Sequence, residues 1–215
     1  ASNDLQDIIN KANSGDEIWI SRGTYKPIRL ASSYTGPEHA ADRDNAFVID
    51  KGVKLYGGFR GGETSLNERS WYENKTILSG DLESNDDENN PASTSDNAYH
   101  VVIVMTTEIP AIDGFIISNG NADDGTNGTG SITVNTANIN RSYGGGIYLE
   151  STNASLTNLI ITANSASNGG GLYMGNQSSA ILTNRFVVRN AANNGGGLFI
   201  NSSDPIFTNV TIADN

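Results

Sequence analysis

Residues 81–88 form the segment whose side-chain spacing is best suited to metal chemistry. Oxygen-bearing side chains alternate along it at Asp81, Glu83, Asn85 and Asp87. Hard cations such as Ca²⁺ take about six to eight oxygen ligands from a flexible loop, and alternating side chains can converge on one point. The segment lacks the glycine and the distal glutamate of an EF-hand loop, so a solvated acidic turn is the alternative interpretation. Ca²⁺ is the one cofactor that the sequence suggests.

Three aromatic residues at equivalent places of a repeated pattern form a second candidate site. Tyr148, Tyr173 and Phe199 each lie between two apolar residues of a short segment. Because side chains of a strand alternate between its faces, these rings are expected to point away from the core that their neighbours fill. Stacked about 5 Å apart, they would form either a sugar-binding face or a ladder that only strengthens strand stacking.

Arg185 is a charged residue at an apolar place of the same pattern, because Leu159 and Val210 occupy the equivalent positions. A guanidinium buried without a partner is costly, so we expect its side chain to reach toward a loop or a corner. The two histidines, His39 and His100, lie in no recognisable catalytic motif. His100 precedes an apolar segment and is expected to be structural.

Composition narrows the class of protein. The 215 residues include 24 glycines and 28 asparagines, both poor helix formers, which disfavours a helical bundle. The formal net charge of −11 argues against binding to nucleic acid or to anionic lipid, and it is compatible with divalent cations and neutral glycans. No apolar run approaches the length of about 18 residues that a membrane span needs, so we expect no insertion into a membrane. The chain has no cysteine and therefore no disulfide framework.

A repeat organises the C-terminal third of the sequence. Glycine triplets begin at Gly144, Gly169 and Gly195, at spacings of 25 and 26 residues. Short segments of alternating apolar and polar residues follow each triplet, which indicates strands, and a period of this length indicates stacked units that share one core. Four inward columns are predicted: Ile147, Leu172 and Leu198; Leu149, Met174 and Ile200; Leu156, Leu182 and Phe207; Ile161, Val187 and Ile212.

Asparagines recur in the same pattern. Asn164, Asn190 and Asn215 end successive repeats. Their amides are expected to hydrogen-bond to one another along the stack, in turns that tolerate left-handed backbone geometry.

These repeats resemble the right-handed parallel β-helix of pectin-lyase-like proteins, and in particular the polymorphic outer-membrane-protein repeats of large bacterial surface proteins. The N-terminal half is similar to the same group in the segments 15–20, 23–27, 52–59, 63–66, 69–71, 76–81, 97–102 and 113–115. The resemblance implies an all-β domain over residues 1–215, a single-stranded right-handed parallel β-helix with a short N-terminal capping helix. It does not settle activity, because this fold hosts lyases, hydrolases, adhesins and passive stalks.

Several segments are expected to depart from the strand pattern. The cap comprises residues 1–14, with a helix from Asn3 to Ala12 that Asn3 is expected to cap and whose apolar face comprises Leu5, Ile8, Ile9 and Ala12. Residues 84–97 and 119–143 are predicted to protrude as loops, with a strand-like stretch at 132–134. Arg69 and Trp71, which match the resembled pattern, are expected to fix a loop against the stack. We also expect further repeats to follow Asn215.

The favoured function is that of a non-catalytic, adhesin-like module, monomeric, secreted or associated with the outer membrane at the cell surface. Its expected partner is an extracellular polysaccharide or a cell-surface glycan. The alternatives are a polysaccharide lyase or glycoside hydrolase of the same fold, and a passive stalk. In lyases of the resembled fold an arginine acts as base beside a carboxylate-bound Ca²⁺, a role for which Arg185 would need Asp123, Asp124 and Arg141 as neighbours.

Overall fold

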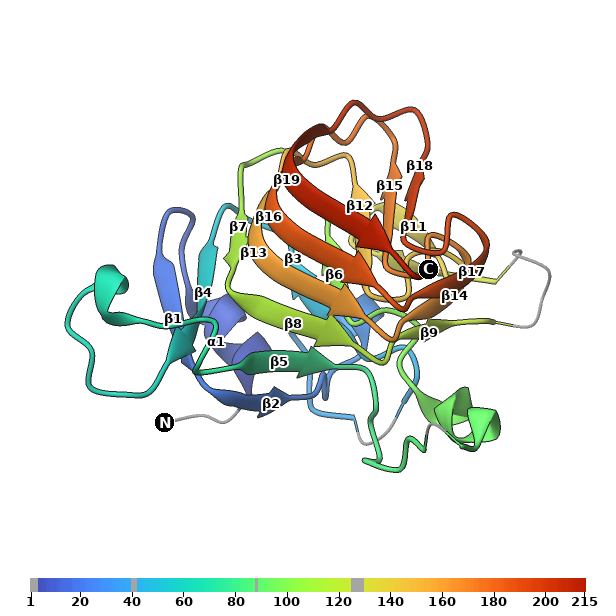
Figure 1. The fold of residues 1–215 in the computed structure, drawn as a ribbon, viewed down its shortest axis with the longest axis horizontal. Coiled ribbons are helices and arrows are strands. Elements are labelled where there is room, and N and C mark those ends of the chain that lie inside the picture. The colour runs from blue at the N-terminus through green and yellow to red at the C-terminus, as the bar shows by residue number, and fades with distance from the viewer. Residues whose placement is uncertain (1–3, 40–41, 88, 125–129) are drawn as a thin grey trace.

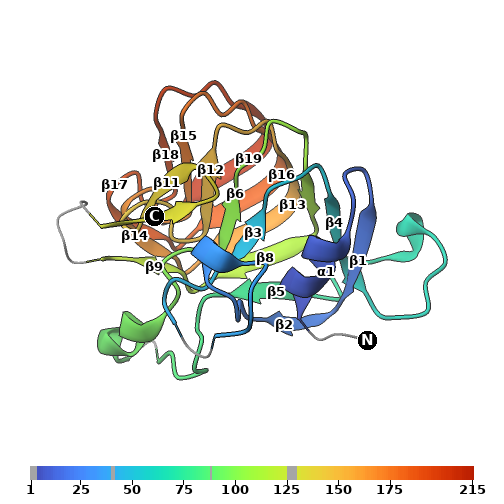
Figure 2. The ribbon, with the colours of Figure 1, turned by 180° about the vertical axis from the view of Figure 1, so that it is seen from behind.

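The computed structural model describes residues 4–39, 42–87, 89–124 and 130–215, and over these residues the chain is predominantly β-structure. One α-helix, α1 (Leu5–Lys11), and the 3-10 helices η1 (Ala31–Ser33), η2 (Leu66–Glu68) and η3 (Pro91–Asp96) accompany the strands (Figures 1 and 2). The strands are β1 (Glu17–Ser21), β2 (Gly23–Tyr25), β3 (Phe47–Ile49), β4 (Lys54–Phe59), β5 (Thr76–Ser79), β6 (Val102–Val104), β7 (Ala111–Asp113), β8 (Phe115–Ser118), β9 (Asn121–Ala122), β10 (Ser131–Val134), β11 (Ala137–Asn140), β12 (Ile147–Glu150), β13 (Ser155–Thr162), β14 (Ser165–Asn168), β15 (Leu172–Gly175), β16 (Ile181–Val188), β17 (Ala191–Asn194), β18 (Leu198–Ile200) and β19 (Ile206–Ala213).

Parallel sheets carry the fold, so the all-β class predicted from the sequence is confirmed. In the largest sheet β13 pairs with β7 through its first half and with β8 through its second half, and β16 and β19 continue the sheet beyond it. The second parallel sheet has the order β3-β6-β12-β15-β18, and the third has the order β9-β14-β17. Strands that are far apart in sequence therefore lie side by side in chain order, as the colour gradient of Figure 1 shows.

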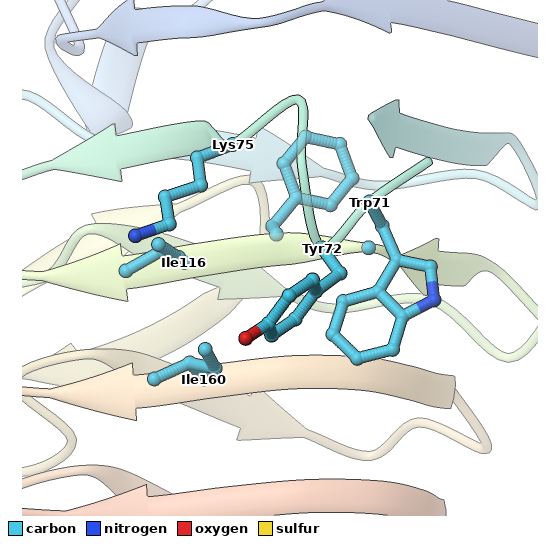
Figure 3. A pocket seen from close by; sticks show the side chains of 7 residues that line it. Trp71, Tyr72, Lys75, Ile116 and Ile160 are labelled. Atoms are coloured by element: carbon cyan, nitrogen blue, oxygen red, sulfur yellow. The ribbon is translucent and has the colours of Figure 1, made fainter. Parts of the chain in front are cut away.

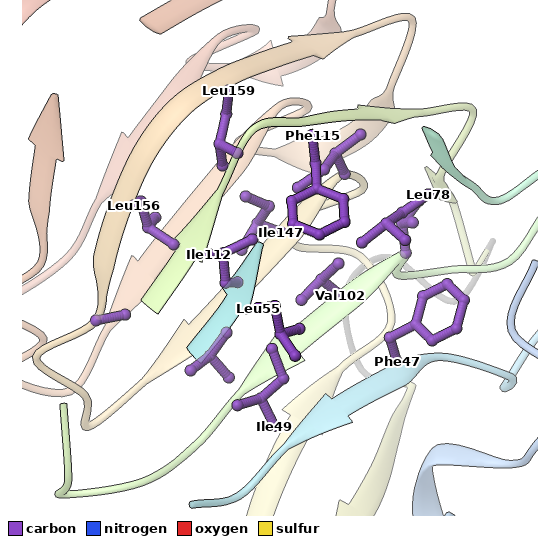
Figure 4. Packing of buried hydrophobic residues seen from close by; sticks show 14 of the residues in the cluster. Phe47, Ile49, Leu55, Leu78, Val102, Ile112, Phe115, Ile147, Leu156 and Leu159 are labelled. Atoms are coloured by element: carbon purple, nitrogen blue, oxygen red, sulfur yellow. The ribbon is translucent and has the colours of Figure 1, made fainter. Parts of the chain in front are cut away.

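The register of these sheets confirms the four predicted columns. In the second sheet Ile147 pairs with Leu172 and Leu172 with Leu198, while Leu149, Met174 and Ile200 pair in the same way. In the first sheet Leu156, Leu182 and Phe207 are partners, as are Ile161, Val187 and Ile212. The buried members of these columns share one apolar interior. Figure 4 shows part of this interior, with Ile147 and Leu156 among its labelled side chains.

The last members of three columns are not buried as expected. Ile200, Phe207 and Ile212 are 42%, 42% and 51% exposed. They belong to β18 and β19, which are edge strands, so the described chain covers these side chains from one side only. Burial of the preceding members Leu182 and Val187 is complete.

The central glycines of the first two triplets, Gly145 and Gly170, are required by close approach of the backbone. A Cβ atom at Gly170 would lie 2.3 Å from the carbonyl oxygen of Ala191 and 2.7 Å from that of Gly196. No side chain fits between backbones at that distance, so the glycine repeat reflects the tight stacking of successive units.

The asparagine column bonds along the stack as predicted. Asn164 Nδ2 donates to Asn190 Oδ1 over 3.0 Å, and Asn190 Nδ2 donates to Asn215 Oδ1 over 2.9 Å. Asn164 and Asn190 are buried. The same oxygens also accept from backbone N–H groups, as Asn190 Oδ1 does from Asn164 N, so the ladder satisfies buried polar groups in place of solvent.

The N-terminal helix is observed, with a different capping residue. The N-cap of α1 is Asp4, whose side chain accepts hydrogen bonds from the backbone of Gln6 and Asp7. The predicted cap, Asn3, lies outside the described residues. Of the predicted apolar face, Leu5 and Ile9 are buried against the main core, the buried cluster that includes Phe47, Leu55, Val102, Ile147 and Leu156. Ala12 packs partly buried against this core, but Ile8 is 38% exposed, so its predicted place on the buried face is wrong. The Gln6 side chain also bonds to both backbone groups of Val48, which joins the helix to β3.

The two segments predicted as protruding loops differ from each other. The described part of this first segment, residues 84–87 and 89–97, forms turns and the short helix η3. In residues 119–143, β9 joins the third parallel sheet, and β10 and β11 form an antiparallel hairpin that confirms the strand predicted at 132–134. The hairpin does not protrude freely, because Ile132, Val134 and Ile139 are buried in a second core. That core contains Ala31, Tyr34, Ala46, Val48, Ile103, Ile132, Val134, Ile139, Tyr148 and Tyr173.

Candidate functional site

A pocket beneath the loop that joins β4 to β5 is the candidate site. Its cavity measures about 260 Å³ and lies on the outer face of the largest sheet (Figure 3). The lining residues are Trp71, Tyr72, Lys75, Gly114, Phe115, Ile116 and Ile160. Trp71 and Tyr72 meet edge to face, with ring centroids 6.2 Å apart, and the Tyr72 side chain is 76% exposed at the mouth.

The floor of the pocket belongs to an apolar column on the outside of the sheet. Ile77, Ile116, Ile160 and Phe186 are register partners on β5, β8, β13 and β16. Their neighbours Leu78, Ile117, Ile161 and Val187 point inward and are buried. The column is therefore a second apolar face, and Phe186 at its end is 50% exposed.

The loop above this floor is fixed by Arg69, as the sequence predicts. Its guanidinium forms an ion pair with Asp113, with Nη2 2.7 Å from Oδ2, and donates to the carbonyl oxygen of Gly57 over 2.9 Å. It also lies 5.2 Å from the centroid of the Tyr56 ring. Because Arg69 and Asp113 are largely buried, this charge-assisted contact positions Trp71 rigidly over the sheet.

Gly114 gives the loop room to approach the sheet. Its φ of +84° is left-handed, and a Cβ atom there would lie 2.7 Å from Arg69 Nη1 and 2.8 Å from Trp71 Cβ. The residues of the motif Asp113-Gly114-Phe115 therefore share one role: the aspartate pairs with Arg69, the glycine admits the loop and the phenylalanine lines the pocket.

The predicted aromatic column exists, but its rings are covered. Ring centroids of Tyr148 and Tyr173 are 4.8 Å apart and those of Tyr173 and Phe199 are 5.9 Å apart. Tyr148 and Tyr173 are only 3% and 5% exposed, because the hairpin β10–β11 packs over them in the second core. Burial raises the pKa of the Tyr148 phenol well above its ordinary value. Of the two alternatives for this column, the sugar-binding face is wrong for the two buried tyrosines and the stacking ladder fits them, whereas Phe199 is partly exposed.

The acidic run does not converge as its alternation suggests. Asp81 Oδ1 accepts from the backbone of Asn85 and lies 3.8 Å from Lys26 Nζ, while Asp87 Oδ1 accepts from Asn89. Glu83 is exposed. Ser84 has a φ of +61°, so the chain turns there and the geometry of an extended segment is lost. Among the described residues no three His, Cys, Asp or Glu side chains are grouped to hold a metal ion.

The charged residues considered for a lyase are already paired or lie apart. Arg141 binds Asp44 through two hydrogen bonds of 2.7 Å, and Asp123 pairs with Arg43. Asp124 accepts from Ser142 Oγ over 2.9 Å. Both guanidiniums lie near the Tyr99 ring, at 4.1 Å for Arg43 and 5.7 Å for Arg141. These groups form a structural ion-pair cluster.

Arg185 is buried in the main core, which overturns the expectation that it reaches a loop. Its side chain is 1% exposed, and none of its three guanidinium nitrogens has a hydrogen-bond partner. Pairing with Leu159 and Val210 fixes its inward direction, so the side chain lies among the apolar residues of the stack. Burial lowers the pKa of this guanidinium to about 9, and the charge of Asp113 opposes the shift.

Sequence reasoning missed the pocket at Trp71 and Tyr72. The available signal was the pair of adjacent apolar residues in each strand, Ile116-Ile117 and Ile160-Ile161, because consecutive apolar residues of a strand make both faces apolar.

No family model, no curated protein and no solved structure matches this chain. None of the helices in the described ranges has the length and apolar character needed to cross a bilayer.

Proposed function

We propose that this chain is a non-catalytic, adhesin-like module of a secreted or cell-surface protein, and that it binds a carbohydrate in the Trp71–Tyr72 pocket. The proposal includes the fold expected from the resemblance, a single-stranded right-handed parallel β-helix. In-register parallel pairing at intervals of 25 and 26 residues supports that fold. The resemblance of the repeats to bacterial surface proteins supports the location.

The observation that carries the proposed activity is the exposed Tyr72 ring at the mouth of an apolar pocket on a rigid loop. The C–H faces of sugar rings pack on aromatic rings, and an aromatic side chain already held in place contributes affinity at little entropic cost. The Arg69–Asp113 ion pair supplies that rigidity.

Lys75 gives the pocket a preference for acidic over neutral sugars. It is exposed beside Ile116 and forms no ion pair within the described part of the chain. An ammonium group donates to sugar hydroxyls and attracts carboxylates. We therefore expect an acidic sugar, such as a uronic acid unit, to bind more tightly than its neutral counterpart.

Substituting Tyr72 by alanine tests the binding proposal. A glycan array selects the ligand, and isothermal titration then compares the wild-type chain with the variant. We expect affinity to fall about tenfold or more, equivalent to about 1.4 kcal/mol. Stability should change by less than about 0.5 kcal/mol, because the side chain is largely exposed.

The matched control is Ile109→Ala, which removes another large exposed apolar side chain, 67% exposed, that does not line the pocket. It should leave binding unchanged. Lys75→Gln should weaken an acidic ligand and spare a neutral one. A chain that binds no glycan on the array, or a Tyr72→Ala variant that binds as tightly as the wild type, would contradict the proposal.

A further inference from the structure

Three buried oxygen atoms near the start and end of the 84–97 segment have no hydrogen-bond donor. They are Asp86 Oδ1, Asp96 Oδ1 and Asn97 Oδ1, each shielded from solvent and without a partner in the described chain. The Asn97 residue is only 1% exposed. Buried polar atoms in folded proteins almost always have a hydrogen-bond partner. Three buried acceptor oxygens without one in a single segment therefore indicate a bound ligand that oxygen can coordinate, such as a cation.

Hydrogen bonds of the other polar atoms of these side chains, Asp86 Oδ2, Asp96 Oδ2 and Asn97 Nδ2, place the three residues in one cluster. Asn97 Nδ2 donates to Asp86 Oδ2 over 3.0 Å, so the Asn97 side chain lies against the Asp86 carboxylate. Asn119 Nδ2 donates to Asp86 Oδ2 as well. Asn85, the residue before Asp86, donates to Asp96 Oδ2 over 2.7 Å. Each carboxylate thus has one oxygen engaged by amides and the other one left over.

The negative charge of this segment favours the binding of a cation. Residues 81–97 contain six acidic residues and no lysine or arginine. Among the ion pairs of the described residues, none involves Asp86 or Asp96. Two carboxylates and an amide oxygen that share a small region repel one another electrostatically unless a positive charge lies between them.

We propose that Asp86, Asp96 and Asn97 bind Ca²⁺ through these three oxygens. Carboxylate and amide oxygens are hard donors, the type that Ca²⁺ prefers, and this ion tolerates irregular geometry with water among its ligands. Water can enter from the adjoining open cavity of about 580 Å³, which is lined by Asp86, Asp87, Asn89, Thr94 and Asn119. The set differs from the alternating residues of the acidic run, whose oxygens are partly engaged elsewhere.

The site would fasten the 84–97 segment to the stack. Asn97 lies directly before Ala98, whose backbone donates to the carbonyl oxygen of Gly80 at the end of β5. Asn119, which contacts Asp86, follows β8. An ion at Asp86 and Asn97 therefore joins the loop to the ends of two neighbouring strands, and binding should raise the melting temperature.

Calorimetric titration of the chelator-treated chain with CaCl₂ tests the site, with thermal unfolding as a second readout. We expect binding and a rise in melting temperature with Ca²⁺, and much weaker effects with Mg²⁺, which demands a regular octahedral site. Asp86→Asn and Asp96→Asn should each lower the affinity about tenfold or more. Neither variant should unfold the calcium-free chain, because each removes a charge that lacks an ionic partner there.

Asp87→Asn is the matched control, because Asp87 adjoins Asp86 but its Oδ1 already accepts from Asn89. It should change calcium affinity by less than about twofold. Loss of binding in Asp87→Asn, with Asp86→Asn and Asp96→Asn unaffected, would assign the ion to the alternating residues instead. Absence of both heat and thermal shift at millimolar Ca²⁺ would overturn the site altogether.

Discussion

Replacing Arg185 by methionine is expected to raise the free energy of unfolding by about 1–4 kcal/mol at pH 7. The wild-type guanidinium is 1% exposed and has no hydrogen-bond partner among the described residues. Methionine follows the path of the arginine stem through the core and removes the buried charge, while Leu159 shows that an apolar residue suits the equivalent position. Urea denaturation at pH 7 measures the difference.

The pH dependence of this gain follows from the lowered pKa of Arg185. Because the folded-state pKa, about 9, is below the ordinary value of 12.5, the unfolded chain binds the proton more tightly than the folded chain. The destabilisation is therefore complete below pH 9 and is relieved as pH rises from 9 toward 12.5. The advantage of Arg185→Met should shrink over that range.

Arg189→Leu is the control for Arg185→Met, because Arg189 lies four residues further along the chain and is exposed. We expect it to change stability by less than about 0.5 kcal/mol. If Arg185→Met proved less stable than the wild type at pH 7, the guanidinium would have a stabilising partner in solution, and its description as an uncompensated buried charge would be wrong.

Acidification from pH 6.5 to 4 is expected to destabilise the chain by about 3 kcal/mol through His100 alone. Burial lowers the pKa of this imidazole to about 4, against an ordinary value of 6.5. Between these values the unfolded chain binds a proton and the folded chain does not, so stability is lost as pH falls through the interval and levels off below pH 4. His100 Nδ1 contacts the carbonyl oxygen of Gly144, and the ring packs edge-on against Tyr148.

The contribution of His100 is isolated by comparing unfolding free energies of the wild type and His100→Phe at several pH values. Phenylalanine keeps the aromatic contact with Tyr148 and cannot titrate. The wild type should lose about 3 kcal/mol relative to this variant between pH 6.5 and 4. A constant difference between wild type and His100→Phe across this range would show that His100 does not stay neutral in the folded chain.

The repeat predicted the parts of the fold that depend on local pattern. Apolar residues at equivalent positions of the repeat, such as Leu156 and Leu182, were predicted to be register partners, because stacked units place equivalent residues side by side. The same logic predicted the bonding between Asn164 and Asn190. The loop anchor at Arg69 followed from resemblance, and its partner Asp113 became visible only in the structure.

Features that depend on contacts between distant segments were not predictable from the sequence. Tyr148 and Tyr173 lie outside the main core as expected, but nothing in their own repeats indicates that residues 131–140 fold back over them. Arg185 was expected to avoid the core on energetic grounds, yet strand alternation outweighed the cost of burying its charge. The pocket combines a loop between β4 and β5 with the outer face of β8 and β13, so neither part alone suggests a site.

The claim on which the four apolar columns and the asparagine ladder depend is that segments about 25 residues apart lie directly beside one another. Its most direct test is disulfide formation in Thr157→Cys/Thr183→Cys, because the chain has no cysteine of its own and the two threonines are register partners. Adjacent strands are about 4.8 Å apart, within the range that a disulfide bridges. In the control Thr157→Cys/Thr208→Cys the two cysteines lie on β13 and β19, with β16 between them. Their separation of about 10 Å is too large for a disulfide. Peptide mapping under non-reducing conditions should find an intramolecular disulfide in the first pair and free thiols in the second. Free thiols in the first pair, or equal crosslinking in both, would contradict the stacked arrangement.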